Sequence, residues 1–94
     1  MKTREEKLKC AVNEYVDKNL SAVDNWTTLG EDQISHIKNI AISIVFDREG
    51  IMHGGHFVKA VLNNDLENAL FRADSVCERA LKLFIYVKKF VYIQ

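Results

Sequence analysis

The sequence contains no proline, and only four of its 94 residues are glycine. Proline breaks helix interiors, because it lacks an N–H group and its ring clashes with the preceding turn. The chain also lacks any apolar run of the 18 or more residues that a membrane-spanning helix requires. Hydrophobic residues nevertheless make up 48% of the chain, well above the level of disordered proteins. We therefore expect a compact, all-α protein that has no membrane span.

An excess of charge of either sign is also missing. Thirteen basic and thirteen acidic residues cancel, whereas broad duplex binding depends on neutralising phosphates with excess cations. This balance argues against duplex nucleic acid as a partner and leaves room for a small anionic ligand. Cys10 and Cys77 form no CxxC pair, and no signal-type apolar segment lies near the start. We expect free cysteines and a cytosolic protein.

The length predicts a single domain, 1–94, whose own core is thin. A chain of this size buries only about 60 to 65% of its unfolded surface, so self-association is expected. The Thr3-Arg4-Glu5-Glu6 string has the spacing of a capping box, and apolar residues then recur at helical intervals. We predict an N-terminal helix over 1–20, a polar loop over 21–30 and a helical region over 31–94.

The region 31–94 has strong helical periodicity. Its first helix is expected to be apolar on more than one face and to stop at Gly50. A short helix over 57–62 follows, and the Asn-Asn-Asp string at 63–65 supplies N-cap residues. Helical spacing then continues for about 27 residues, which predicts one long final helix of roughly 40 Å. Its end is aromatic, so we place Phe84 and Val87 at an interface with another copy.

The string His53-Gly54-Gly55-His56 offers two possible zinc ligands. A zinc site needs at least one more protein ligand, and no further histidine or cysteine pair has suitable spacing. The simpler interpretation gives Gly54 and Gly55 a turn with positive φ before the short helix. A phosphate cradle here is a weak alternative, because no strand precedes it and no GK[ST] tail follows. We expect no metal, no cofactor and no catalytic residue, since no Ser-His-Asp or Cys-His arrangement stands out.

Five polar or aromatic residues are candidates for ligand binding. Trp26 lies in a polar loop, where it offers either a stacking surface for a base or an anchor plugged into the core. Thr28 is our first candidate for a further contact from this loop. Lys38 and Ser43 project from the second helix and Arg72 from the last, among mainly apolar neighbours. Cations in such places bind ligands or simply extend along apolar surface toward water.

The string GGHFVKAVLNNDLENALFRADSVCERALKLFIYV, which begins at Gly54, carries the pattern GG-x-FV-x-AV-x-x-NDL-x-x-A-x-x-RAD. This pattern resembles the hairpin domain shared by phage anti-CBASS sponges and Thoeris anti-defence sponges, which sequester cyclic nucleotide alarm signals. The similarity is clearest from Gly54 to Phe84 and extends back to Trp26. The helix predicted over 1–20 has no counterpart.

The resemblance implies an architecture and a function. The protomer would be a helical hairpin of two long antiparallel helices with a short connecting helix, here with an extra N-terminal helix. Six protomers would interlock as a homohexamer, with ligands held between subunits. The protein would bind cyclic dinucleotides such as 3′,3′-cGAMP without cleaving them, and cyclic trinucleotides as some members do. In the host cytoplasm this sequestration would keep CBASS effectors from being activated.

The resemblance also assigns roles to residues. Trp26 takes the position of the family's base-stacking aromatic residue, and Arg72 that of the arginine in the RAD string. The family's phosphate-binding lysine falls at Ala41, so Lys38, one turn earlier on the same helical face, is the candidate replacement. Ser43 falls where a hydroxyl group contacts the ligand. A cyclic dinucleotide has an approximate two-fold axis, which suits two copies of one site from two protomers.

Two rival functions remain open from the sequence. One is a small helical inhibitor or adaptor that binds a host protein through its apolar C-terminal helix. The other is a small hydrolase of the same ligands that uses His53, His56 and a carboxylate on a metal ion.

Overall fold

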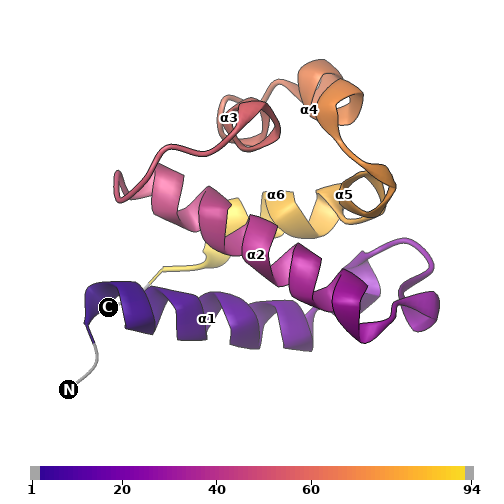
Figure 1. Ribbon diagram of the computed structural model, residues 1–94, viewed down its shortest axis with the longest axis horizontal. Helices are drawn as coiled ribbons and strands as arrows, with labels where there is room; N and C mark the ends of the chain where they lie inside the picture. The colour runs from indigo at the N-terminus through magenta and orange to yellow at the C-terminus, as the bar shows by residue number, and fades with distance from the viewer. Residues whose placement is uncertain (1–2, 93–94) are drawn as a thin grey trace.

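The computed structural model describes residues 3–92, and all regular structure within this range is helical (Figure 1). Residues 1–2 and 93–94, the ends of the predicted first and last helices, lie outside it. The all-α class is confirmed, and no helix in the described part is long and apolar enough to cross a bilayer. The elements in chain order are α1 (Arg4–Lys18), η1 (Leu20–Ala22), η2 (Trp26–Thr28), α2 (Glu31–Arg48), α3 (His56–Leu62), α4 (Leu66–Arg72), α5 (Ser75–Arg79) and α6 (Leu81–Phe90).

Helix α1 begins where the capping-box spacing predicts. The side chain of Thr3 accepts a hydrogen bond of 3.2 Å from the backbone N–H of Glu6, which satisfies one of the free donors of the first turn. Leu8, Val12 and Val16 recur every fourth residue and are fully buried. Helix α1, which carries this stripe, packs along α2 (Figure 1).

Helix α2 runs through the centre of the molecule, with α1 on one side and α3 on the other, and it also packs on α6 (Figure 1). Ile37, Ala41, Ile44 and Val45 are fully buried along one face, and Phe46, on the opposite face, is only 6% exposed. This confirms that more than one face is covered. The helix ends with Gly50 in the left-handed region, at φ 76°. The Ile51 N–H donates to the Phe46 carbonyl at 2.8 Å, and the Gly50 N–H donates to the Asp47 carbonyl at 3.0 Å. This pair of hydrogen bonds is a Schellman motif.

The glycine pair before α3 has a different role from the predicted one. Gly50 is the one glycine with positive φ, so the prediction of positive φ at Gly54 and Gly55 is wrong. Gly54 is required by close approach instead: a Cβ there would lie 2.6 Å from Val58 Cβ and closer still to Cγ1. The Gly54 N–H also bonds Asp47 Oδ2 at 2.9 Å, which holds this loop against the end of α2.

The prediction of one long final helix is also wrong. Asp65 caps α4 as expected, but Ala73 is extended, at ψ 138°, and ends this helix after seven residues. Asp74 then caps α5, because its side chain accepts the Cys77 N–H at 2.7 Å. Ala80, at φ −97° and ψ 4°, separates α5 from α6. The second arm of the expected hairpin is therefore three short helices, of which α4 packs against α3 while α5 and α6 pack against α2.

These breaks change which apolar residues are buried. Phe84 and Val87 are fully buried in the protomer, so their predicted place at an interface between copies is wrong. Phe84 meets Phe57 of α3 edge to face, with ring centroids 5.7 Å apart. Because most apolar residues of α6 are in the core, α4 is the described helix with the most exposed large apolar side chains. We call Leu66, Leu70 and Phe71 the α4 patch, in which Phe71 is 83% exposed.

Candidate functional site

The loop between α1 and α2 presents Trp26 at the surface. Asn25 adopts a left-handed conformation, at φ 55°, which begins η2. The Thr28 hydroxyl donates to the Asn25 carbonyl at 2.7 Å, and the Leu29 N–H bonds the Trp26 carbonyl at 3.1 Å. The side chain of Trp26 remains 46% exposed on this turn. The Trp26 side chain therefore does not fill a place in the core, and about half of its surface is accessible to a ligand.

A side chain from α5 braces this turn. Arg79 donates from Nε to the Asp24 carbonyl at 2.9 Å and from Nη2 to the Asn25 carbonyl at 2.8 Å and Thr28 Oγ1 at 2.9 Å. The Arg79 carbonyl in turn accepts the Asp24 N–H at 3.0 Å. Sequence reasoning missed Arg79, because nothing in the local pattern links it to a loop more than 50 positions earlier. The hydroxyl of Thr28, predicted as a ligand contact, is used in this brace.

Lys38 and Ser43 lie on α2 without forming a phosphate site in the protomer. Lys38 Nζ is 2.8 Å from Asp17 Oδ1 and so pairs α2 with α1. Ser43 is half-buried. Ala41, where the resembling family has its lysine, is fully buried between helices. A phosphate cannot be contacted at that position while the protomer keeps this packing, and Lys38 would contact one either beside Asp17 or in its place.

Arg72 lies in another layer of the molecule. It stands at the end of α4, which Figure 1 shows on the opposite side of α2 and α5 from the loop with η2. With His56, Lys59, Asn63 and Asn68 it lines a shallow polar cavity of about 220 Å³. Within one protomer the structure therefore does not bring Arg72 to Trp26. The predicted residues form three separate groups: Trp26 with Thr28 on η2, Lys38 with Ser43 on α2, and Arg72 alone.

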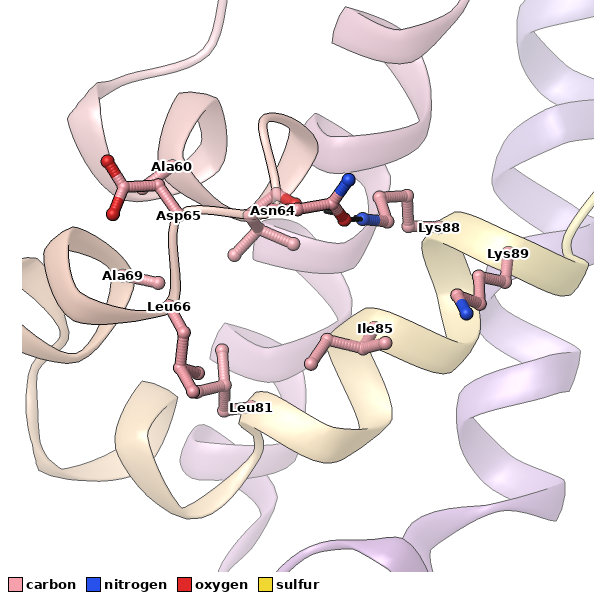
Figure 2. Close-up of a pocket in the computed structure, with 10 residues that line it drawn as sticks. Ala60, Asn64, Asp65, Leu66, Ala69, Leu81, Ile85, Lys88 and Lys89 are labelled. Atoms are coloured by element: carbon pink, nitrogen blue, oxygen red, sulfur yellow. Dashed lines mark hydrogen bonds between the residues drawn. The ribbon is translucent and has the colours of Figure 1, made fainter.

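A second cavity of about 220 Å³ lies where the turn before α4 meets α6 (Figure 2). Leu66, Leu81 and Ile85 make its wall apolar, and Lys88 stands at one end. Lys88 Nζ donates to the Val61 carbonyl at 3.1 Å and to Asn64 Oδ1. Burial, with a smaller contribution from the neighbouring Lys89, lowers the pKa of Lys88. The cavity suits a mainly apolar group: Lys88 is already held by two oxygens, and Lys89 is the second cation in its lining.

The two histidines of the HGGH string are exposed. Among the described residues, the side chains that could jointly hold a metal ion are instead His36, Asp74 and Cys77, which belong to α2 and to the start of α5. Nε2 of His36 faces both Asp74 and Cys77, so the order Asp–His–Cys of a nucleophilic triad, which uses both ring nitrogens, does not form. Burial and the carboxylate of Asp74 raise the pKa of the Cys77 thiol to about 12. In the metal-free protein this thiol is protonated and is a poor nucleophile.

The described part of the chain is thus a small all-helical fold that exposes one braced tryptophan. Comparisons with protein-family models, with curated proteins and with solved structures find no match. The resemblance to the phage sponges stays a prediction.

Proposed function

We propose that this protein is a non-enzymatic phage counter-defence sponge, which binds cyclic dinucleotides such as 3′,3′-cGAMP between its own copies. The observation that carries the proposal is the 46% exposure of Trp26 on a turn that Arg79 fixes. Stacking on an aromatic ring contributes roughly 1 to 3 kcal/mol per base. A turn that is already ordered loses less conformational freedom on binding, so more of this energy appears as affinity.

The size of the cavities supports a site shared by copies. Three cavities along the described residues measure about 220, 220 and 190 Å³. Pockets that enclose small ligands usually measure about 300 to 1,000 Å³. A cyclic dinucleotide therefore needs walls from more than one protomer. Two Trp26 rings related by a two-fold axis would bracket its two bases, which matches the symmetry of the ligand.

The phosphates require cations from a neighbouring protomer or a rearranged ion pair. Arg72, beside Lys59 and His56, is an exposed cation that a second copy can bring to the phosphates. Lys38 can contribute by exchanging Asp17 for a phosphate, and Ser43 lies on the same helix. Two stacked bases and two charge-assisted hydrogen bonds give roughly 5 to 12 kcal/mol before ordering costs. Nanomolar sequestration needs about 12 kcal/mol, so further contacts from both copies are part of the proposal.

The α4 patch is the surface we assign to self-association, in place of Phe84 and Val87. Leu66, Leu70 and Phe71 are exposed on consecutive turns, and Arg72 follows them directly. Covering this patch with another copy removes apolar surface from water and brings Arg72 to the boundary between protomers. A closed homohexamer, in which α2 is the long arm of each interlocked protomer, extends this proposal. Cyclic trinucleotides are further candidate ligands.

Incubating the purified protein with 3′,3′-cGAMP, heating it and analysing the released nucleotide tests the function. Intact nucleotide supports the sponge, and degraded nucleotide supports a hydrolase. If the nucleotide is neither bound nor degraded, both are excluded. Trp26→Ala should abolish retention while the oligomer mass stays unchanged. Phe90→Ala, which removes another exposed aromatic ring far from η2 in the sequence, is the matched control and should retain the ligand.

A helical inhibitor or adaptor that binds a host protein is the second candidate, and the 83% exposure of Phe71 favours it. The sequence placed its binding surface on the C-terminal helix, but the apolar face of α6 is in the core. The α4 patch is the corresponding exposed surface. A protein that retains no nucleotide and stays monomeric with this patch intact would support the adaptor over the sponge.

A further inference from the structure

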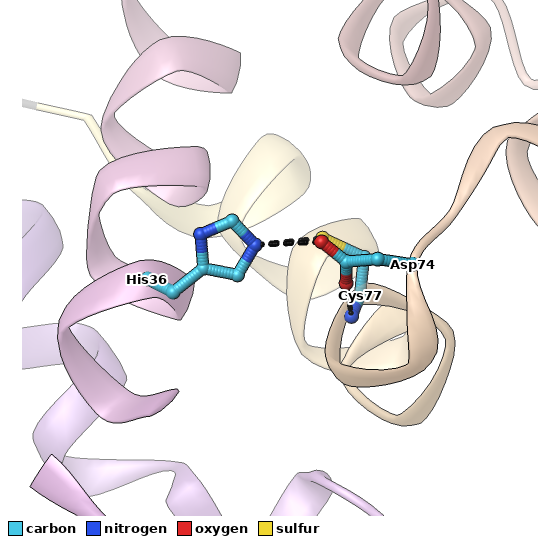
Figure 3. A group of neighbouring side chains, drawn as sticks. All are labelled: His36, Asp74 and Cys77. Carbon is cyan, nitrogen blue, oxygen red and sulfur yellow. Dashed lines mark hydrogen bonds and ion pairs between the residues drawn. The ribbon is translucent and has the colours of Figure 1, made fainter. Parts of the chain in front are cut away.

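Three side chains with metal-binding atoms meet where α2 packs against α5 (Figure 3). His36 Nε2 is 2.8 Å from Asp74 Oδ2 and 3.8 Å from Cys77 Sγ. The nitrogen, oxygen and sulfur atoms all lie within 4.8 Å of one another. One ring nitrogen thus faces both partners, and the three atoms surround a common point.

These separations are close to those of tetrahedral zinc ligands. With bonds of about 2.0 to 2.1 Å to nitrogen and oxygen and about 2.3 Å to sulfur, a tetrahedron places nitrogen about 3.3 Å from oxygen and about 3.6 Å from sulfur. The observed nitrogen–oxygen distance is 2.8 Å and the nitrogen–sulfur distance is 3.8 Å. For these two pairs, shifts of a few tenths of an ångström, within reach of side-chain rotation, would produce the bound distances.

The carboxylate of Asp74 is already oriented for this role. Its Oδ1 accepts the backbone N–H of Cys77 at 2.7 Å as the N-cap of α5, and its Oδ2 points at His36 (Figure 3). Hydrogen bonds from the surroundings that fix a ligand's orientation are typical of metal sites. Asp74 therefore has two roles. Its Oδ1 caps the start of α5, and its Oδ2 is directed toward the point that the three ligand atoms surround.

We propose that His36, Asp74 and Cys77 bind a zinc ion that ties α2 to α5. Zinc accepts imidazole, thiolate and carboxylate together, whereas magnesium and calcium prefer oxygen ligands alone. The side chains of His36 and Asp74 are 42% and 55% exposed, while Cys77 is buried. The ion therefore has three protein ligands and one side open to water or to a ligand atom from outside the protomer.

The zinc site also bears on the turn that carries Trp26. Helix α5 has only five residues, and its last residue is Arg79, which holds that turn through three hydrogen bonds. A metal ion at the start of α5 fixes this short helix to α2 and with it the position of Arg79. Zinc binding should therefore restrict the motion of the Trp26 ring. This inference does not depend on the proposed nucleotide-binding function.

Zinc titration of the chelator-stripped full chain, against a chromophoric competitor, tests the site. We expect one ion per chain, and each of His36→Gln, Asp74→Asn and Cys77→Ala should weaken binding at least about tenfold. Asparagine keeps the N-cap of α5, so Asp74→Asn removes the ligand charge while preserving the helix. His53→Gln and Cys10→Ala are matched controls that should bind zinc as the native chain does. Native affinity in all three site variants, or no uptake by the native chain, would overturn the proposal.

Cobalt and heat give two further readouts. Cobalt in the same site should show an absorption band from thiolate coordination, and Cys77→Ala should lose it while keeping the helical circular dichroism. Zinc at about ten times its Kd should raise the Tm of the native chain by roughly 5 to 10 °C. An unchanged Tm, or a cobalt–thiolate band that survives in Cys77→Ala, would contradict the assignment.

Discussion

Arg79 Nη2 lies 2.9 Å from Thr28 Oγ1, so a side chain of α5 fixes a turn that is 51 positions earlier in the chain. The same guanidinium reaches the carbonyls of Asp24 and Asn25. Arg79 therefore holds the Trp26 turn from outside, in addition to the hydrogen bonds within the turn itself. Its rigidity is therefore a tertiary property that local sequence does not determine.

Replacing Arg79 with methionine should loosen the turn while leaving the helices in place. Three hydrogen bonds are lost at a partly exposed position, so the free energy of unfolding should fall by about 1 to 3 kcal/mol. Fluorescence anisotropy of Trp26 should drop, and the affinity for 3′,3′-cGAMP should weaken about tenfold. Arg4→Met, which breaks a pair between Arg4 and Glu49 near the start of α1, is the control. Equal anisotropy in the two variants would show that Arg79 does not restrain the turn.

Substituting the two neighbouring glycines should give opposite results. Gly54→Ala forces a Cβ into Val58 and should lower the free energy of unfolding by about 1 to 3 kcal/mol. Gly55 has negative φ, and a Cβ there meets nothing within 4 Å. Gly55→Ala should therefore be neutral or stabilise by up to about 1 kcal/mol, because it restricts the unfolded chain. Urea denaturation of both variants measures the difference, and equal effects would contradict the close contact at Gly54.

Two phenylalanines distinguish the protomer core from the proposed interface. Phe84→Ala should lower the free energy of unfolding by about 3 to 5 kcal/mol, because Phe84 is fully buried. Phe71→Asp should leave the helical circular dichroism unchanged and reduce the oligomer mass in sedimentation velocity. A native sedimentation profile for Phe71→Asp would exclude the α4 patch as the self-association surface.

Stability should fall in acid because of Asp47. Its side chain is only 8% exposed, and the hydrogen bond from Lys59, together with that from the Gly54 N–H, lowers the pKa of this carboxyl below its usual 3.8. A pKa that is lower in the folded chain stabilises the fold above the unfolded value. This contribution is lost as the pH falls through about 4 toward the folded pKa. Urea denaturation from pH 6 to pH 2 measures the loss, and both Asp47→Asn and Lys59→Met should flatten the curve in this range.

The first half of the fold is predictable from sequence because its signals are local. The cap at Thr3, the buried stripe of α1 and the stop at Gly50 all lie where spacing and turn chemistry indicate. The prediction of one long final helix was wrong because apolar spacing continues across Ala73, whereas the break depends on capping by Asp74. A periodic pattern does not show whether an aspartate caps a new helix or lies on the surface of an old one.

The candidate site is only partly predictable, for a related reason. A tryptophan among short polar residues leaves two alternatives, an exposed ring or a core anchor, and the 46% exposure of Trp26 favours the first. Arg79 and the His36–Asp74–Cys77 group depend on how α5 packs against the rest of the molecule. Spacing rules for metal ligands look for neighbours in the sequence, whereas His36 is 38 positions from Asp74.

The brace from Arg79 also constrains the order of events during synthesis. The Trp26 turn leaves the ribosome well before residue 79 is added, so it stays unrestrained while α1 and α2 are already able to pair. The ring acquires its fixed orientation only after α5 has docked. The anisotropy of Trp26 would then rise late in refolding, when α5 docks, and nascent fragments that end before residue 79 would present a loose ring.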